Sequence, residues 1–307
     1  MAYDIFCIDA DYLRPRLACS YLILHHGKAA FIDCGTNHSV PRLLETLASC
    51  GLSTDAVDYI IPTHIHLDHA GGAGVLMQQC KNAKLIVHPK GVRHLSDPNR
   101  LIESVKEVYG VEKYNALYGE IIPIDENRII PAIHDSTIDL NGRPLIIADT
   151  PGHARHHICL YDIFSNGWFT GDTFGISYPD IEIPSGNYLF PTTTPVQFEP
   201  EAWVTSLDIL LQKNPDKMYL THFNTVENVI ELASKLKSDL IHYVELAKSF
   251  ADSKNRVETL ISELYKYTLS DLRALGNNQD DDRLRELLTT DMTLNAQGLD
   301  VWLSRTS

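Results

Sequence analysis

The segment Thr63-His64-Ile65-His66-Leu67-Asp68-His69 carries four potential metal ligands within six residues. It directly follows Tyr59-Ile60-Ile61, which has the pattern of a short buried strand. His64 and His66 alternate around an apolar residue, so their imidazoles project to the same side if the backbone is extended. A surface histidine cluster would not follow a buried strand so closely. Clustered His and Asp at this spacing therefore predict a metal site.

Three later segments repeat the same design, a strand that ends in a potential ligand. They are Asp149-Thr150-Pro151-Gly152-His153, Phe169-Thr170-Gly171-Asp172-Thr173 and Tyr219-Leu220-Thr221-His222. Each is weak alone, because a single histidine at a strand end is more often structural. Together with the first segment they supply five His and two Asp, enough for two metal ions with open coordination positions.

Composition and charge restrict the classes of partner. The 307 residues include 26 Lys plus Arg against 40 Asp plus Glu, giving a net charge of -14 without basic runs. This disfavours nucleic acid, whose binding depends on phosphate contacts. The sequence contains no run of about 18 apolar residues, so no membrane span is expected. The N-terminal segment, residues 1–7, lacks the features of a signal peptide, and the six cysteines are scattered, so a reducing cytoplasmic location is expected.

The pattern of predicted elements indicates two layers of strands with helices outside. An early hairpin is expected at 21–25 and 29–32, helices at 39–50, 100–118 and 201–211, and strands at 129–133, 145–148, 157–161, 168–170 and 218–220. Beyond residue 224 only helical stripes remain. The expected division is therefore a domain that carries the candidate ligands, 1–224, followed by an α-helical extension, 225–307.

Residues 174–198 fit no regular element. A segment of this length without secondary structure is often a lid or a binding loop, although it can equally be a plain connection. Its aromatic residues Tyr178, Tyr188 and Phe190 are the candidates for substrate binding.

The order T-H-x-H-x-D-H, T-P-G-H, G-D-T and T-H resembles the metallo-β-lactamase superfamily over roughly residues 15–225. The resemblance implies an α/β (α+β) fold, a four-layer αββα sandwich with the site at one edge of its two sheets, here with a C-terminal α-helical extension. It also implies a ligand set in which Asp172 bridges two metal ions. One ion would be bound by His64, His66 and His153, and the other by Asp68, His69 and His222.

The chemistry implied by the resemblance is hydrolysis of an ester-like bond by a metal-bridged hydroxide. Two divalent ions are expected, zinc first and iron or manganese as alternatives, because neutral imidazoles suit all three. Asp68 is the candidate catalytic residue for proton handling. Asp33 is either a partner that orients a ligand histidine or an ordinary turn residue, and His157 is expected to be structural.

Differences from other branches of the superfamily narrow the range of expected substrate classes. His66 stands where the flavodiiron branch has Glu. The acidic charge disfavours the nucleic-acid-processing branch, and the absence of an export signal disfavours a secreted lactamase. Thioesterases, glyoxalase-II-like enzymes and lactonases remain, acting on a small molecule that is partly apolar. The helical tail resembles that of glyoxalase II and of the quorum-sensing thioesterase of the alkylquinolone pathway.

Two other classes stay open. A persulfide dioxygenase would bind one iron and oxidise its substrate, and a regulator would use the pocket for binding with incidental hydrolase activity. The tail would form either a pocket wall or the interface of a homodimer.

Overall fold

The protein is described by a computed structural model that covers residues 4–306. Residues 1–3, part of the segment searched for a signal peptide, lie outside the described residues. Within the described range, no helix is both long enough and apolar enough to span a membrane.

The first half of the chain forms a six-stranded sheet in the order β1-β2-β3-β4-β5-β6. The strands are β1 (Ile5–Asp9), β2 (Cys19–His25), β3 (Lys28–Ile32), β4 (Val57–Ile61), β5 (Lys84–Val87) and β6 (Ile129–Pro131). β2 and β3 are the expected hairpin, and the pairs from β3 to β6 are parallel. β6 ends at Pro131, two residues earlier than expected, since proline cannot donate to a sheet ladder.

The second sheet has the order β12-β11-β10-β9-β8-β7. Its strands are β7 (Thr137–Leu140), β8 (Arg143–Asp149), β9 (Ile158–Asp162), β10 (Gly167–Gly171), β11 (Lys217–Leu220) and β12 (Asn224–Val226). β10 and β11 pair in parallel, so their carboxyl ends meet at one edge of the sheet.

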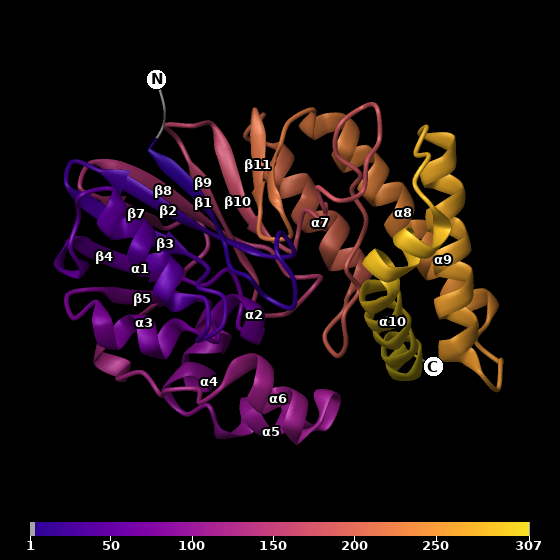
Figure 1. The fold of residues 1–307 in the computed structure, drawn as a ribbon, viewed down its shortest axis with the longest axis horizontal. Coiled ribbons are helices and arrows are strands. Elements are labelled where there is room, and N and C mark those ends of the chain that lie inside the picture. The colour runs from indigo at the N-terminus through magenta and orange to yellow at the C-terminus, as the bar shows by residue number, and fades with distance from the viewer. Residues whose placement is uncertain (1–3, 307) are drawn as a thin grey trace.

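The sheets pack face to face through alternate apolar side chains, among them Tyr21, Ile32, Ile147 and Phe169. Helices α1 (Val40–Ser49) and α3 (Ala73–Gln79) cover the outer face of the first sheet, and α7 (Pro200–Leu211) covers the second. Figure 1 shows α1 and α3 beside the strands of the first sheet and α7 beside β11. The predicted four-layer sandwich is confirmed.

Seven further helices complete the described part of the chain. They are α2 (Leu67–Ala70), α4 (Val92–Ser96), α5 (Asn99–Tyr109), α6 (Val111–Tyr118), α8 (Val229–Ser249), α9 (Arg256–Ala274) and α10 (Asp281–Thr306), with short 3-10 turns at Thr54–Ala56, Pro89–Gly91 and Glu126–Arg128. The single helix expected over 100–118 is two helices, because Gly110 adopts a positive φ of 80° that interrupts helical geometry.

The helical extension packs on the second sheet and on α7. One hydrophobic cluster contains Trp168 of β10 and Trp203 of α7 together with Leu240, Leu264 and Leu288 of the extension. Figure 1 shows α8, α9 and α10 side by side at the right of the molecule, with the connection after β10 running between them and the sheets. Whether residues 225–307 form a separate unit stays a prediction.

Candidate metal centre

The candidate ligands lie where strands of both sheets end. β4 ends at Ile61, just before His64, and β8 ends at Asp149, just before the T-P-G-H turn. In that turn Gly152 has a φ of 142°, and a Cβ placed there would lie 2.4 Å from the Cα of Trp203. Glycine is needed at this position because α7 approaches the backbone too closely for any side chain.

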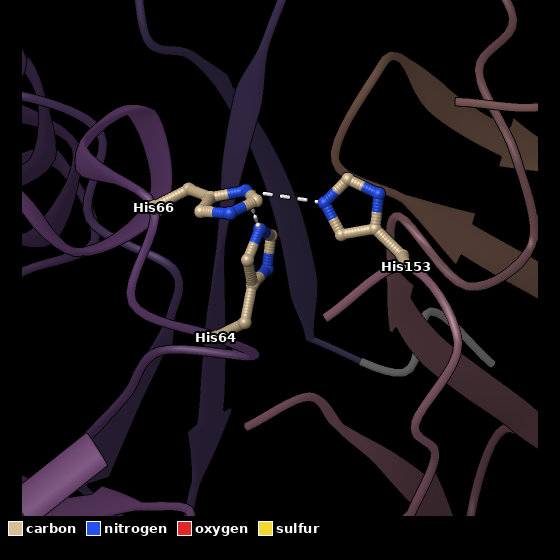
Figure 2. Close-up of side chains that lie close together, drawn as sticks. All are labelled: His64, His66 and His153. Carbon is tan, nitrogen blue, oxygen red and sulfur yellow. Dashed lines mark hydrogen bonds between the residues drawn. The ribbon is translucent and has the colours of Figure 1, made fainter. Parts of the chain in front are cut away.

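Three imidazoles from two segments point toward one another, as Figure 2 shows. His66 Nδ1 lies 2.8 Å from His64 Nε2 and 3.1 Å from His153 Nε2. His64 and His153 are almost fully buried. The geometry suits one small cation held by three nitrogens.

A second group adjoins the first. Asp68, His69 and His222 also bring one ligand atom each within 4.8 Å of one another. Asp172 lies between the two groups, with Oδ2 3.3 Å from His153 Nε2 and Oδ1 3.2 Å from His69 Nε2. Asp172 Oδ1 is buried but accepts no hydrogen bond of acceptable geometry from the described residues. A cation at this point would satisfy that oxygen.

The outward-facing nitrogens of three of these histidines contact fixed acceptors. His153 Nδ1 lies 2.9 Å from the Thr192 carbonyl, and His222 Nδ1 lies 2.8 Å from the Leu17 carbonyl. His69 Nδ1 lies 2.9 Å from Asp33 Oδ2. Since these acceptors require a proton on Nδ1, each neutral ring keeps its Nε2 lone pair for the centre. This arrangement is typical of metal-ligating histidines.

Asp33 joins both sheets beneath the centre. Its Oδ1 accepts from the backbone N–H of Thr63 at 2.7 Å, and its Oδ2 accepts from the Thr221 hydroxyl at 2.6 Å. With the contact to His69, the carboxylate holds the segment before His64 and the segment before His222 in register. Of the two interpretations that the sequence left open, the structure favours the orienting partner.

The pKa values of the histidines differ between the two groups of candidate ligands. Burial, followed in effect by His153, lowers the pKa of His66 to about 3, and burial also lowers the pKa values of His64 and His153. These three rings are therefore neutral, as metal binding requires.

In the group of Asp68, His69 and His222, the carboxylates have the larger effect on the pKa values of the histidines. Burial opposes the charge of His222, but Asp172 and Asp68 outweigh it and raise its pKa to about 9. For His69, Asp172, Asp33 and Asp68 likewise outweigh burial and raise the pKa well above its usual value. The local field therefore attracts positive charge, which a metal ion would supply.

His157 is buried beside the centre and has structural contacts. Its Nε2 accepts from the backbone N–H of Asp172 at 3.1 Å, and its Nδ1 lies 3.0 Å from the Thr150 hydroxyl. It fixes the turn that carries Asp172.

A cavity of about 490 Å³ opens over the centre. His66, Asp68, Asp172 and His222 form its floor. Its side walls include residues of α5 and α6 on one side and of α10 on the other. Apolar side chains such as Leu101, Leu117 and Leu294 are mixed there with polar or charged ones such as Arg100, Lys113 and Glu286.

The three aromatic candidates of residues 174–198 occupy different places. Tyr178 lines the cavity, and its hydroxyl donates to Asp291 of α10 at 3.0 Å. Tyr188 and Phe190, each 1% exposed, are part of the hydrophobic core and do not line this cavity. Because they are buried among apolar residues of the extension, their role is packing. The sequence alone does not reveal this role for an aromatic residue in a connection.

Two residues near the site, Asp291 and Asn295, were not singled out from the sequence. Asp291 lines the cavity, and Asn295 binds the segment that supports His153. The available signal was two polar residues on the otherwise apolar stripe of a long helix. That signal identifies buried polar positions without identifying their contacts.

Comparison with known proteins supports the assignment of these residues to a metal centre. The model of the metallo-beta-lactamase superfamily matches residues 13–222, which contain all seven candidate ligands. The chain is 28% identical over 211 residues to the metallo-beta-lactamase fold-containing protein ST1585 of Sulfurisphaera tokodaii, covering 68% of this chain and 73% of that protein. It is 30% identical over 163 residues to the endoribonuclease YSH1 of Yarrowia lipolytica, but this match covers 50% of the chain and 18% of that protein.

Solved structures share the fold over the whole chain. The crystal structure of ST1585 has a TM-score of 0.67 at 24% identity, with all of both chains covered. The metallo-beta-lactamase family protein TTHA1429 of Thermus thermophilus has a TM-score of 0.68 at 19% identity, covering 99% of this chain and 94% of that one. At these identities the likeness concerns the fold, including the helical extension.

Proposed function

The chain belongs to the metallo-β-lactamase superfamily, and from that premise we propose that it is a dinuclear metal-dependent hydrolase of an ester-like bond. One observation carries the proposal. Seven potential ligands that follow four strands converge on one centre, and three of the histidines direct Nε2 toward it because Nδ1 contacts a fixed acceptor.

His64, His66 and His153 would hold one ion, Asp68, His69 and His222 the other, with Asp172 shared. The imidazole-rich donor set makes zinc the first candidate, with iron or manganese as alternatives. Two such ions, when bound, supply hydroxide near neutral pH and polarise the substrate oxygen that faces them.

Asp68 is the residue we propose for proton handling. Its side chain is 21% exposed, lines the cavity, and has Oδ2 3.4 Å from His222 Nε2. It can therefore contact both the centre and a substrate, and it is more exposed than Asp172, the other carboxylate of the cavity floor, whose side chain is 6% exposed.

The cavity supports a medium-sized, partly apolar substrate. A volume of about 490 Å³ is within the range of small-molecule pockets, and leucines line both side walls. A thioester or lactone with an apolar chain would place its carbonyl on the polar floor and its chain between α5, α6 and α10. Three statements about partners stay predictions: the substrate is a small molecule, neither nucleic acid nor a membrane is a partner, and the protein forms a homodimer.

Elemental analysis of the purified protein tests the proposal. We expect about two metal ions per chain, and a sharp loss in His66→Ala purified in the same way. His38→Ala, at an exposed histidine outside the cluster, is the matched control and should keep the full metal content. Thioesters, lactones and phosphodiesters are then screened with all three proteins.

Other outcomes distinguish the competing functions. One iron per chain with sulfite formation would favour the persulfide dioxygenase. Full metal content with a normal biological output after turnover is abolished would favour the regulator. No bound metal when zinc, iron and manganese are supplied would refute the dinuclear centre.

A further inference from the structure

One turn of α10 is joined by hydrogen bonds to the segment 191–193 of the catalytic part. Asn295 Oδ1 accepts from the backbone N–H of Thr193 at 2.6 Å, and Asn295 Nδ2 donates to the Pro191 carbonyl at 3.0 Å. The Thr193 hydroxyl donates to the Asn295 carbonyl at 3.0 Å. Asn295 is 1% exposed and Thr193 is fully buried, so water cannot replace these contacts.

A glycine makes this close approach feasible. Gly298 lies one turn after Asn295 on the same face of α10. A Cβ placed at Gly298 would lie 1.5 Å from the Thr193 carbonyl oxygen. Helix and segment therefore touch backbone to backbone, and any side chain at residue 298 would push them apart.

The contact reaches His153 through a single peptide unit. Asn295 accepts from the N–H of Thr193, and His153 Nδ1 lies 2.9 Å from the carbonyl of Thr192. That N–H and that carbonyl belong to the same planar peptide group, whose atoms turn together. When Asn295 fixes the orientation of the Thr193 N–H, it also fixes the direction of the Thr192 carbonyl, which accepts the hydrogen bond from His153 Nδ1–H.

We propose that Asn295 is a positioning residue for His153, which links the C-terminal helix to the ion held by His64, His66 and His153. The inference rests on the proposed function, in which His153 is a ligand. Asn295 acts only on the tautomer and orientation of the ring, since its hydrogen bonds go to residues 191 and 193 and not to the ligands. The group of Asp68, His69 and His222 has other supports, Asp33 and the Leu17 carbonyl, and is not reached by this contact.

Metal titration of Asn295→Ala tests the proposal, with Co²⁺ alone as the probe. We expect one of the two binding steps to weaken roughly 10–100-fold, as when other supports of ligand histidines are lost. The d–d spectrum of that step should change as well, while the other step stays near the wild-type value. Leu284→Ala, a buried position at the start of the same helix, is the control for destabilisation of α10 and should alter neither step.

A second readout separates this inference from the proposed function. Nitrogen-15 NMR of the histidines in chelator-treated protein reports whether His153 carries its proton on Nδ1. The wild type and Leu284→Ala should show the Nδ1–H form, and Asn295→Ala should show a mixture. If the wild type bound no metal, the dinuclear proposal would fail, but the NMR comparison would still decide the role of Asn295.

Rescue and replacement variants keep the test decisive. Asn295→Asp retains an oxygen that can accept from Thr193, and it should restore the Nδ1–H form and most of the cobalt affinity. If Asn295→Ala does not fold, Asn295→Leu keeps the side-chain volume and is measured in the same way. Wild-type affinities, spectrum and tautomer in a folded Ala or Leu variant would overturn the proposal.

Discussion

At the scale of single residues, the centre depends on the ligands and equally on the side chains that orient the ligands by hydrogen bonds. Asp33 is the clearest case, because its two oxygens receive the Thr63 N–H, the Thr221 hydroxyl and His69 Nδ1. Its φ of 53° is left-handed, a conformation that asparagine also tolerates. Replacement by asparagine therefore changes the hydrogen bonding while preserving shape and backbone.

Asp33→Asn is expected to weaken the ion held through His69. Asparagine has one acceptor oxygen where aspartate has two, so it cannot serve Thr63 and His69 together. We expect roughly a 10–100-fold loss of affinity in one binding step, measured by competition with a chromophoric chelator. Asp58→Asn, on the surface, is the control. Unchanged affinity in Asp33→Asn would show that the carboxylate does not orient His69.

At the scale of elements, the buried face of α10 includes polar residues as well as apolar ones. Asp291, Asn295 and Gly298 recur at helical spacing and all face the segment between Ile176 and Thr194. Amphipathic periodicity predicts such a helix from sequence, but polar residues within its buried face find their partners only after folding.

The carboxyl group of Asp291 makes stability depend on pH. Burial raises its pKa to about 6 from an ordinary value of 3.8, and the opposing effects of Tyr178, His222 and Arg14 do not overcome burial. The folded chain therefore keeps this proton at pH values where the unfolded chain has released it. Because unfolding then releases a proton, the contribution of Asp291 to stability is present below pH 4 and is lost as pH rises through 6.

Urea unfolding of wild type and Asp291→Asn between pH 4 and 7 measures this contribution. The free energy of unfolding of the wild type, minus that of the variant, should fall by about 2–3 kcal/mol over this range. Asparagine can still accept from the Tyr178 hydroxyl, so the contact is kept. Asp282→Asn, exposed at the start of α10, serves as the control. A difference that is flat or rises with pH would contradict the assignment.

At the scale of the whole molecule, the sandwich and the extension share one core. The cluster that includes Trp168 and Trp203 continues without interruption into α8, α9 and α10, where it includes Trp302. A shared core of this kind couples the stability of its parts.

We therefore expect residues 4–306 to unfold in a single cooperative transition. The chain has three tryptophans, so Trp302→Phe leaves fluorescence only from the sandwich, whereas the double variant Trp168→Phe, Trp203→Phe reports on α10. Both fluorescence transitions should coincide with that of circular dichroism in the same protein. An earlier transition at Trp302 alone would instead support independent unfolding of the extension.

The fold and the position of the centre could be predicted from the sequence because both are encoded in local patterns. The ligands of the first segment lie within six residues, and each later motif follows its own strand, so periodicity and spacing suffice to predict them. The order of these motifs resembles the metallo-β-lactamase superfamily, and that resemblance implied the αββα sandwich. Both the superfamily and the sandwich are confirmed.

The surroundings of the centre were decided only by tertiary structure. Tyr188 and Phe190 are core residues while Tyr178 faces the cavity, although all three come from one connection. Asp33 contacts His69 across 36 positions, and Asn295 reaches the segment supporting His153 across more than 100. A helical stripe indicates that a helix will be buried on one face. The surface that it covers depends on the free energy of packing the whole chain, which no local pattern contains.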